Sequence, residues 1–422
     1  MNMHNLLLGI AIVWPLLLAF PGLHSSLPWP RHLAILPAAL LMLWPGDALL
    51  QVPWLLFGTG LSVDADTRWI LGMSVILWLS AATLFKPNKT KNPTQQTSFF
   101  LMTLCGNLGV VLATDIITFF SFATLMSYSF YTLIIQQHDA PSRRAGRWYL
   151  ICLILADLAL FEAMLLAASV SEDLRYDLVR QEMTQTYSAF YTWMVVFAFA
   201  LKSGIWPFYF WVTAAFKSSS QMTRVLLGGV PIAMGLLGLI RWIPIGEGIF
   251  YTAGIVFQLV GTMTVLHAAL RIFKHGFSLM LTVWFAIAAS GIFCIALGAA
   301  LLEPALWQTY KNLSHPFIAI LGVTLAMLSI MTEKFSAKQQ ATNDAPLFIK
   351  TLYTMYNNIS GIIRQQTANA LQNFQAILND AYLTIINQCR CNSDKLEFLL
   401  SGWKAKITLF VLLGLAFAWL AK

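Results

Sequence analysis

The chain contains few charged residues. Only 10% of its 422 residues are Asp, Glu, Lys or Arg, whereas 58% are hydrophobic. A soluble domain carries about 25% charged residues, so this composition excludes a soluble globular protein. The formal net charge of +8 does not require nucleic acid as a partner, because basic residues of membrane proteins gather in their cytoplasmic loops. The composition predicts a polytopic membrane protein.

The sequence also lacks the short motifs that accompany covalent chemistry. It has no G-x-x-x-x-G-K, no G-x-G-x-x-G after a strand and no H-E-x-x-H. Three of the five cysteines, Cys105, Cys152 and Cys294, lie in apolar segments. The other two, Cys389 and Cys391, form a lone C-x-C pair, which lacks the second pair of a structural zinc site. We therefore predict no catalytic site, cofactor or metal site in this chain, while its membership of an ion-translocating enzyme complex remains open.

Long apolar runs dominate what is present. A transmembrane helix needs about 20 mostly apolar residues. About twelve segments meet that description, near residues 5–22, 31–49, 67–85, 98–114, 116–135, 148–169, 187–206, 222–243, 248–270, 277–299, 313–331 and 405–421. The first has no basic flank or cleavage site of a signal peptide and is expected to be a span. The fold class is therefore all-α, a polytopic bundle of about twelve spans.

One short segment departs from this helical pattern. Residues 52–63 hold two apolar runs around Gly58-Thr59-Gly60. Such runs on either side of a glycine-containing turn predict a short β-hairpin.

The distribution of loop charges predicts the orientation. Basic residues favour the odd-numbered loops, whereas the fourth loop has only Asp115 and the sixth balances its bases with acids. The bases of the odd loops are Arg31, Lys86, Lys89, Lys91, Arg143, Arg144, Arg147, Lys217, Arg224, Arg271 and Lys274. Because basic loops stay in the cytoplasm, the N-terminus and the hairpin are expected outside.

Residues 332–404 differ from the preceding bundle at 1–331. They are polar and rich in Gln and Asn, with apolar residues at steps of mostly three and four from Leu352 to Ile385. This spacing predicts a late amphipathic helix. It would lie along the membrane or along partner helices, or pack on its own protein as a solvated cytoplasmic helix. Residues 405–422 then form the last span.

The strongest candidate for function is Lys202, near the end of the seventh span. A charge at membrane depth is costly and usually has a use. Gly204 and Pro207 interrupt the helix just after it, and a charge beside a broken helix marks the ion site of many transporters. We predict a broken helix near 202–217 with Lys202 as a proton carrier. The alternative is a lysine that snorkels to the interface.

Two acidic residues in the sixth span are candidate partners for this lysine. Asp157 and Glu162 are five residues apart, which places them about 140° apart around a helix. They cannot share one face, but either one can face Lys202. Acidic groups at this depth normally point into the bundle and find a partner, so a proton-carrying pair and a purely structural ion pair both remain open.

Two histidines complete the list of candidates. His267 lies late in the ninth span, and His315 opens the eleventh. Histidine suits a proton relay because its charge changes near neutral pH. In each case the alternative is a histidine that caps its helix or forms an internal hydrogen bond.

The segment from Lys202 to Trp211 resembles the K-S-A-x-x-P-F-H-x-W motif of the antiporter-like proton-conducting membrane subunits. That superfamily includes subunits of respiratory complex I, the Mrp cation/proton antiporters, the membrane-bound hydrogenases and the DAB inorganic-carbon pumps. Thr124-Leu125-Met126-Ser127-Tyr128-Ser129 is similar to the family's E-L-M-S-L-S. The resemblance covers roughly residues 50–300, with an antiporter-like core at about 98–300, so this chain resembles a divergent and shortened member.

The resemblance implies a role for Lys202, but two other charged residues of the family have no counterpart in this sequence. In the family the lysine of the broken seventh helix is the central proton carrier, and Lys202 matches it. The family's fifth-helix glutamate is replaced here by Thr124, and residues 225–240 hold no counterpart of the eighth-helix histidine or lysine. Asp157 or Glu162 would then replace the lost glutamate as the partner of Lys202.

Three functions follow. The first is a proton- or cation-translocating subunit of a multi-subunit complex in a bacterial-type inner membrane, which couples the flow of protons or sodium to a partner subunit. The second is the membrane subunit of a DAB-type inorganic-carbon pump, which works with a large peripheral zinc protein. The third is a structural, non-conducting subunit that kept the fold and lost the ion path.

Overall fold

The computed structural model describes residues 3–52, 58–85, 93–171, 173–185, 188–246, 250–275 and 279–341, and every structural statement below refers to this part of the chain. Its first half contains α1 (Met3–Leu18), α2 (Pro21–His24), α3 (Pro30–Leu43), β1 (Ala48–Val52), β2 (Thr59–Val63), α4 (Ala65–Leu84), α5 (Pro93–Leu112), α6 (Ile116–Ile134), η1 (Ile135–Gln137) and α7 (Ala140–Val170). Its second half contains α8 (Tyr176–Gln185), α9 (Ser188–Ser203), α10 (Phe210–Ser218), α11 (Gln221–Gly229), α12 (Pro231–Trp242), α13 (Tyr251–His275), α14 (Leu281–Leu302) and α15 (Pro304–Ala341).

The helices match the predicted membrane spans in order. Seven described helices are long and apolar enough to cross a membrane, and α1, α3 and α9 are shorter apolar helices. The helix α5 has 20 residues but carries polar side chains such as Gln95, Gln96 and Asn107. Eleven of the twelve predicted segments are therefore helical, and the twelfth, 405–421, lies outside the described residues. The fold class is confirmed as a polytopic helix bundle, whereas the count of about twelve spans is not.

Side-chain caps set the starts of several helices. The carboxylates of Asp64, Asp115 and Asp139 accept hydrogen bonds from the backbone N–H groups of Thr67, Thr118 and Ser142, at 2.7, 2.7 and 2.8 Å. Each carboxylate satisfies one of the N–H groups that a helix leaves unpaired at its N-terminus. These caps explain why α4, α6 and α7 begin where they do.

The hairpin is present, but its first strand lies earlier in the chain than predicted and its second strand begins at Thr59. The strands β1 and β2 pair antiparallel from Ala48↔Val63 to Val52↔Thr59, so Thr59 and Gly60 lie within β2 and not in a turn. A Cβ at Gly60 would clash with the Thr114 side chain, and the Gly60 N–H donates to Asp115 Oδ2 at 3.0 Å. Glycine therefore allows the hairpin to pack against the junction of α5 and α6.

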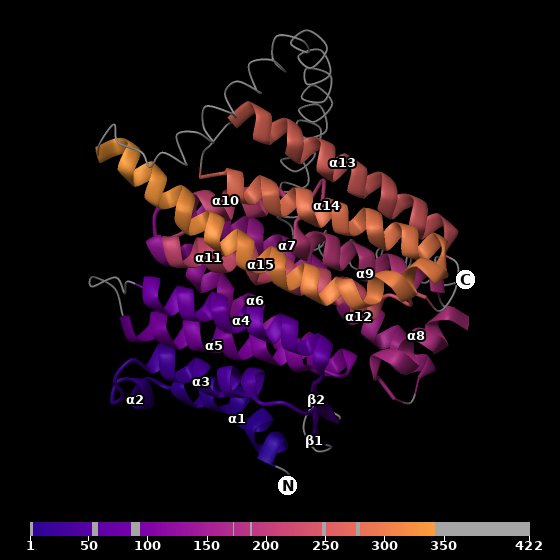
Figure 1. Cartoon of the computed structure of the whole chain (residues 1–422), viewed down its shortest axis with the longest axis horizontal. Coiled ribbons are helices and arrows are strands. Elements are labelled where there is room, and N and C mark those ends of the chain that lie inside the picture. Colours follow the sequence, from indigo (N-terminus) through magenta and orange to yellow (C-terminus); the bar gives the residue numbers. More distant parts are fainter. Residues whose placement is uncertain are drawn as a thin grey trace, which may run out of the picture. The chain divides into compact units, whose positions relative to one another are not determined.

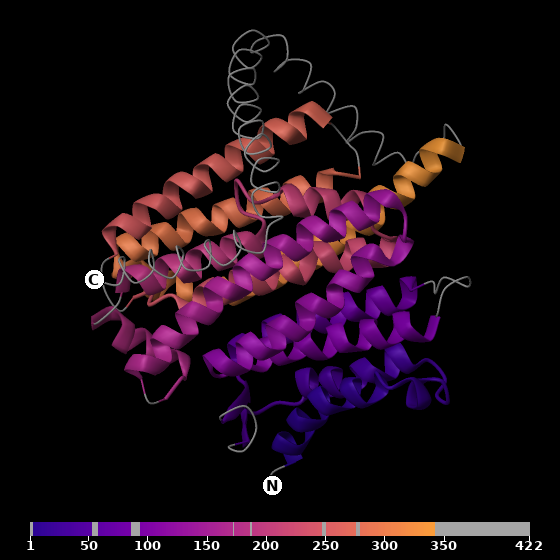
Figure 2. The same ribbon diagram turned by 180° about the vertical axis from the view of Figure 1, so that it is seen from behind.

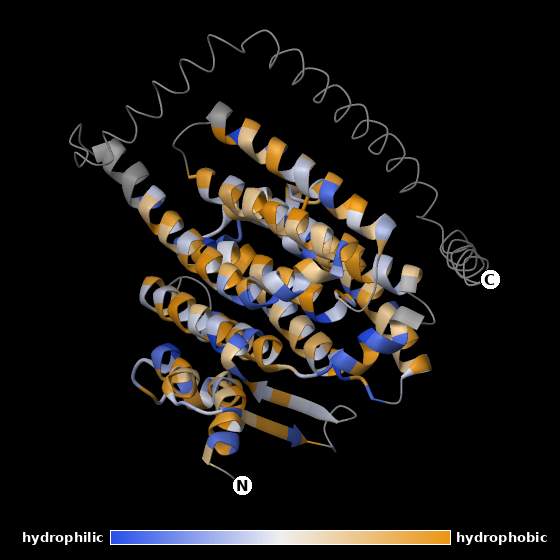
Figure 3. Cartoon of the chain, turned by 45° about the vertical axis from the view of Figure 1, so that its right-hand side comes forward, coloured by the Kyte–Doolittle hydropathy of each residue, from blue (hydrophilic) through white to orange (hydrophobic). Residues whose placement is uncertain are grey.

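Helix–helix contacts rely on small residues. A Cβ on Gly261 of α13 would lie 2.7 Å from the carbonyl oxygen of Gly291 of α14, and a Cβ on Gly298 would lie 2.7 Å from that of Gly254. Small residues let two backbones approach closely where lipid gives no hydrophobic drive. Figures 1 and 2 show α13 and α14 side by side at one side of the bundle, with α1 and α3 at the other. The long helices are mostly hydrophobic along their length (Figure 3).

Several predicted boundaries change. The predicted second span, 31–49, is helical only to Leu43, and β1 begins at Ala48. The predicted eighth span, 222–243, is divided into α11 and α12 at Val230–Pro231, because proline has no N–H to continue the helix ladder. The predicted eleventh span, 313–331, is part of a longer helix, α15, which continues past residue 331 to Ala341. The predicted amphipathic stripe and the last span fall within 342–422, outside the described residues.

Candidate functional site

The seventh span is broken where the sequence predicts it. The helix α9 ends at Ser203 and α10 begins at Phe210. Gly204 has a φ of +65° and a Cβ there would lie 2.5 Å from a methyl group of Val212, so both conformation and space require glycine. The indole N–H of Trp211 donates to the carbonyl of Leu201 at 2.7 Å. This bond links the two half-helices across the break.

Lys202 forms an ion pair with Asp157 directly before this break. Its Nζ lies 2.7 Å from Oδ1 of Asp157, and the two side chains are only 12% and 10% exposed. The lysine comes from the last turn of α9 and the aspartate from the middle of α7. A short, charge-assisted bond between largely buried groups is much stronger than a surface ion pair. The structure therefore holds Lys202 inside the bundle and does not leave it to snorkel.

The ion pair leaves one acceptor unused. Oδ2 of Asp157 is buried and has no hydrogen-bond partner among the described residues. Glu162, the other candidate, is partly buried on α7, and the described ion pairs do not include it. Asp157 therefore uses one of its two carboxylate oxygens in the ion pair with Lys202.

His267 lies against the break and not against Lys202. Its ring centroid is 4.8 Å from that of Tyr209 and 5.8 Å from that of Trp284. Arg271 Nε approaches its Nε2 at 3.5 Å, and the Trp206 N–H donates to Thr264 Oγ1 at 3.3 Å. The helix α13 thus covers the break, and His267 makes no hydrogen bond or ion pair with Lys202 in the described part of the chain.

The positions at which the family carries further charges are apolar or neutral here. Thr124 donates its hydroxyl to the carbonyl of Ser121 in its own helix at 2.8 Å, so it needs no charged partner. Beside Lys202 lies a cavity of about 30 Å³, which we call the lysine cavity. Its wall from α12 consists of Pro231, Met234 and Gly235. No ionisable group of α12 therefore reaches Lys202 through this cavity.

The described residues offer no metal centre. They contain no group of three or more His, Cys, Asp or Glu side chains placed to hold a metal ion. Cys105, Cys152 and Cys294 are free and buried. At the break, the Lys202–Asp157 ion pair places a proton donor next to a proton acceptor.

Sequence analysis missed a second ion pair. Arg224 Nη2 lies 2.7 Å from Oε1 of Glu333, which is 109 residues away in the sequence. The sequence interpretation counted Arg224 as a loop charge, but it lies in α11 and its side chain is only 12% exposed. An acidic residue at the end of an apolar segment was the available signal for Glu333. Its partner could not be found without the fold.

Comparisons with known proteins agree with this architecture. Residues 113–275 match the family model described as NADH:quinone oxidoreductase/Mrp antiporter, transmembrane. One similar chain belongs to the solved structure of the membrane-bound sulfane sulfur reductase, an archaeal respiratory membrane complex. It is 15% identical in sequence, with a TM-score of 0.66. The match covers 76% of this chain and 70% of that chain.

A second match is a chain of the Mrp complex from Dietzia sp. DQ12-45-1b. It is 17% identical, with a TM-score of 0.61, and the match covers 77% of this chain and 63% of that chain. A sequence comparison with curated proteins gives no match. At such identities the structures show a shared fold. Residues 113–275 are thus similar in sequence to this family of antiporter-like membrane subunits, and the chain shares the fold of the two solved membrane subunits.

Proposed function

We propose that this chain is the proton- or sodium-translocating subunit of a multi-subunit membrane complex and that it couples ion flow to a partner subunit. The observation that carries the proposal is the ion pair of Lys202 and Asp157 beside the broken helix. The structural relatives come from respiratory and Mrp complexes, which supports other membrane subunits as partners. The loop charges favour a cytoplasmic membrane with the N-terminus outside.

The ion pair gives a simple mechanism for moving a proton. While Asp157 holds the ammonium of Lys202, the positive charge is stable at this depth. Separation of the pair leaves an unpaired ammonium in an apolar wall, which is costly and favours release of the proton. The break at Gly204–Pro207 lets α9 and α10 move separately, so that a conformational change in a partner subunit can separate the pair.

His267 has a second place in this path. It contacts the break through Tyr209 and lies one helical turn from Arg271. The two ring nitrogens of a histidine can accept a proton on one side and donate one on the other, which suits a relay. We propose that His267 passes protons between the break and the end of α13 that carries Arg271. Glu162 has no ion pair among the described residues and is not part of this path.

Two observations favour the alternative of a structural, non-conducting subunit. The wall of the lysine cavity is mostly apolar, and Thr124 stands where the family has its glutamate. In that case Lys202 would keep its proton at all times, and its ion pair with Asp157 would only hold α9 against α7. Neither the family match nor the two structural relatives support the inorganic-carbon alternative or a peripheral zinc protein.

The experiment starts from the complex as it exists. The tagged chain is isolated with its partners in mild detergent, the partners are identified by mass, and the complex is reconstituted into vesicles. Proton flux is compared for the native chain, Lys202→Ala and Lys217→Ala. Lys217 is a matched control because it lies on α10 and is exposed. Flux lost only in Lys202→Ala supports the proposal, whereas equal flux in all three contradicts it.

A further inference from the structure

A second and much larger cavity lies at the end of the bundle that carries the hairpin. It measures about 360 Å³, and we call it the hairpin cavity. The β2–α4 connection, α8, the end of α12 and the start of α15 contribute its walls. Its acidic and basic lining residues are Asp64, Asp66, Arg180, Arg241, Lys311 and His315. A polar space of this size holds about ten water molecules.

The wall of the hairpin cavity is firmly built. The guanidinium of Arg241 donates to the carbonyl oxygens of Val110, Val111 and Ala113 at 2.7–3.2 Å. It also lies 5.6 Å from the ring centroid of Tyr176. Two of these bonds pair carbonyls in the last turn of α5, which the helix leaves without partners. Arg241 therefore ties α12 to α5 and α8 at the wall of the cavity.

The lysine cavity is different in kind. It has room for one or two water molecules in its volume of about 30 Å³, and its lining is mostly apolar apart from Lys202, Ser127 and Tyr149. The helix α12 borders both spaces, with Pro231 to Gly235 at the lysine cavity and Ile240 and Arg241 at the hairpin cavity. About two turns of helix thus connect a small apolar cavity to a large polar one.

Four aromatic rings bridge the interval between the two cavities. The ring centroid of Phe119 lies 5.9 Å from that of Phe199, 5.9 Å from that of Trp242 and 6.5 Å from that of Tyr176. Phe119 and Phe199 line the lysine cavity, while Tyr176 lines the hairpin cavity. One connected cluster of rings therefore contacts both spaces.

Glycine at position 238 makes this cluster possible. A Cβ at Gly238 would overlap the ring of Phe199, so the absence of a side chain at this position of α12 makes room for that ring. Phe119, Phe199 and Trp242 are almost fully buried, at 1%, 0% and 0% exposure. A tightly packed apolar constriction excludes water and stops the passage of ions until it opens.

We propose that the hairpin cavity is the aqueous end of the ion path and that the ring of Phe119 is the gate between it and Lys202. Water and hydrated protons or small monovalent cations occupy the cavity, whose charges of both signs solvate either. Movement of Phe119 joins the two cavities by a water chain, along which Lys202 exchanges its proton. The role of the cavity in ion transport rests on the proposed function, whereas the existence of the gate does not.

The test measures access to the native thiol of Cys152, which lines the lysine cavity. Silver ions bind thiols and travel only through water-accessible paths. A Ser62→Cys substitution in the hairpin cavity first identifies the membrane face from which silver enters. Silver is then added to that face of the full chain in membranes, and the free thiol of each cysteine is counted by mass spectrometry after denaturation.

The expected result is a reactive introduced thiol in the Ser62→Cys variant, a protected Cys152 in the native chain and a reactive Cys152 in Phe119→Ala. The milder Phe119→Leu gives an intermediate rate and serves if Phe119→Ala folds poorly. Phe120→Ala is the matched control, because Phe120 is the next residue on α6 and contacts Phe161 on α7 instead. In this control variant Cys152 stays protected.

Two outcomes overturn the gate: a Cys152 that is equally reactive in the native chain, or one that stays protected in both Phe119 variants while the thiol of Ser62→Cys reacts. An unreactive thiol in Ser62→Cys overturns the aqueous cavity itself. Proton flux in the same variants separates this inference from the proposed function. Exposure of Cys152 in Phe119→Ala without any flux sensitive to Lys202 supports the gate and contradicts the proposed function.

Discussion

Two ion pairs lie within the described helices, and they have nearly the same geometry but different chemistry. Lys202–Asp157 and Arg224–Glu333 both have an N···O distance of 2.7 Å, and both bases are 12% exposed. Lysine can lose its proton when its environment changes, whereas arginine stays charged under all physiological conditions. A buried charge in a span is therefore not enough to indicate an ion path, because the type of base decides whether a proton can move.

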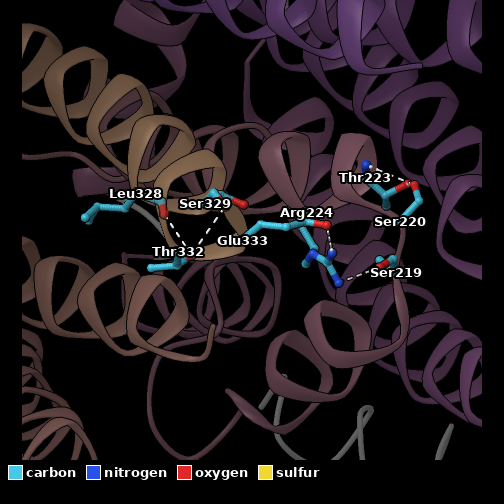
Figure 4. A network of polar contacts seen from close by, with 8 residues as sticks. All are labelled: Ser219, Ser220, Thr223, Arg224, Leu328, Ser329, Thr332 and Glu333. Atoms are coloured by element: carbon cyan, nitrogen blue, oxygen red, sulfur yellow. Dashed lines mark hydrogen bonds and ion pairs between the residues drawn. The ribbon is translucent and has the colours of Figure 1, made fainter. Parts of the chain in front are cut away.

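The surroundings of the two ion pairs also differ. Arg224 also donates to the carbonyl of Ser219 at 2.9 Å, as Figure 4 shows, and lies in the second turn of a regular helix. Thr332 next to Glu333 bonds only to carbonyls of its own helix. Lys202 instead lies one residue before the end of α9, beside the helix break. The arginine pair braces α11 against α15, whereas the lysine pair lies directly beside a helix break.

The largest expected effect that distinguishes the pairs comes from Asp157→Asn. Amide in place of carboxylate keeps the shape of the side chain and removes the charge that stabilises the ammonium. Loss of one partner of a buried pair leaves an uncompensated charge, so Lys202 should lose its proton or move. We expect proton flux through the reconstituted complex to fall by about 10-fold or more.

The control for this variant is Asp157→Glu, which keeps the charge on a longer side chain. It should retain more flux than Asp157→Asn. Equal flux in Asp157→Asn and the native chain would mean that the ion pair has no role in transport.

A smaller and different effect is expected from Arg224→Gln. Removal of the guanidinium breaks the bonds to Glu333 and to Ser219 and should lower the free energy of unfolding by about 2 kcal/mol. Flux per folded molecule should not change, because no proton is exchanged at this pair. Thermal unfolding in detergent measures the first quantity and vesicle flux the second. A loss of flux at unchanged stability would show that the arginine pair also belongs to the path.

The smallest effect is expected from Glu162→Gln. Glu162 has no ion pair among the described residues and lies five residues from Asp157 on α7. Flux should stay within about two-fold of the native value, since the variant removes no charge contact of Lys202. Flux reduced as strongly as in Asp157→Asn would instead show that both acidic residues serve the lysine in turn.

The sequence was sufficient to predict a helix break directly after Lys202, because glycine and proline interrupt a helix through their own local conformation. It was not sufficient to choose between Asp157 and Glu162. Two residues about 140° apart on one helix can be distinguished only when the rotation of that helix in the bundle is known. The structure supplies this rotation and selects Asp157.

Other features depend on contacts between distant segments. The partner of Arg224 lies 109 residues away, and Phe119 meets rings from α8, α9 and α12. Single buried phenylalanines are common in apolar spans, so no pattern in the sequence distinguishes Phe119 from its neighbours. Likewise, Gly60 was assigned to a turn because glycine is typical of turns, although here it serves close packing within a strand.

Exchange of the two bases tests the central claim most directly. The arginine of Lys202→Arg keeps a positive charge next to Asp157 but cannot release its proton. The lysine of Arg224→Lys keeps the ion pair with Glu333 and carries a proton that can be released. Proton flux is measured in vesicles containing equal amounts of each folded complex. The account predicts that Lys202→Arg loses flux by about 100-fold while Arg224→Lys conducts like the native chain. Native flux in Lys202→Arg would contradict it, because a fixed charge would then serve as well as a proton carrier.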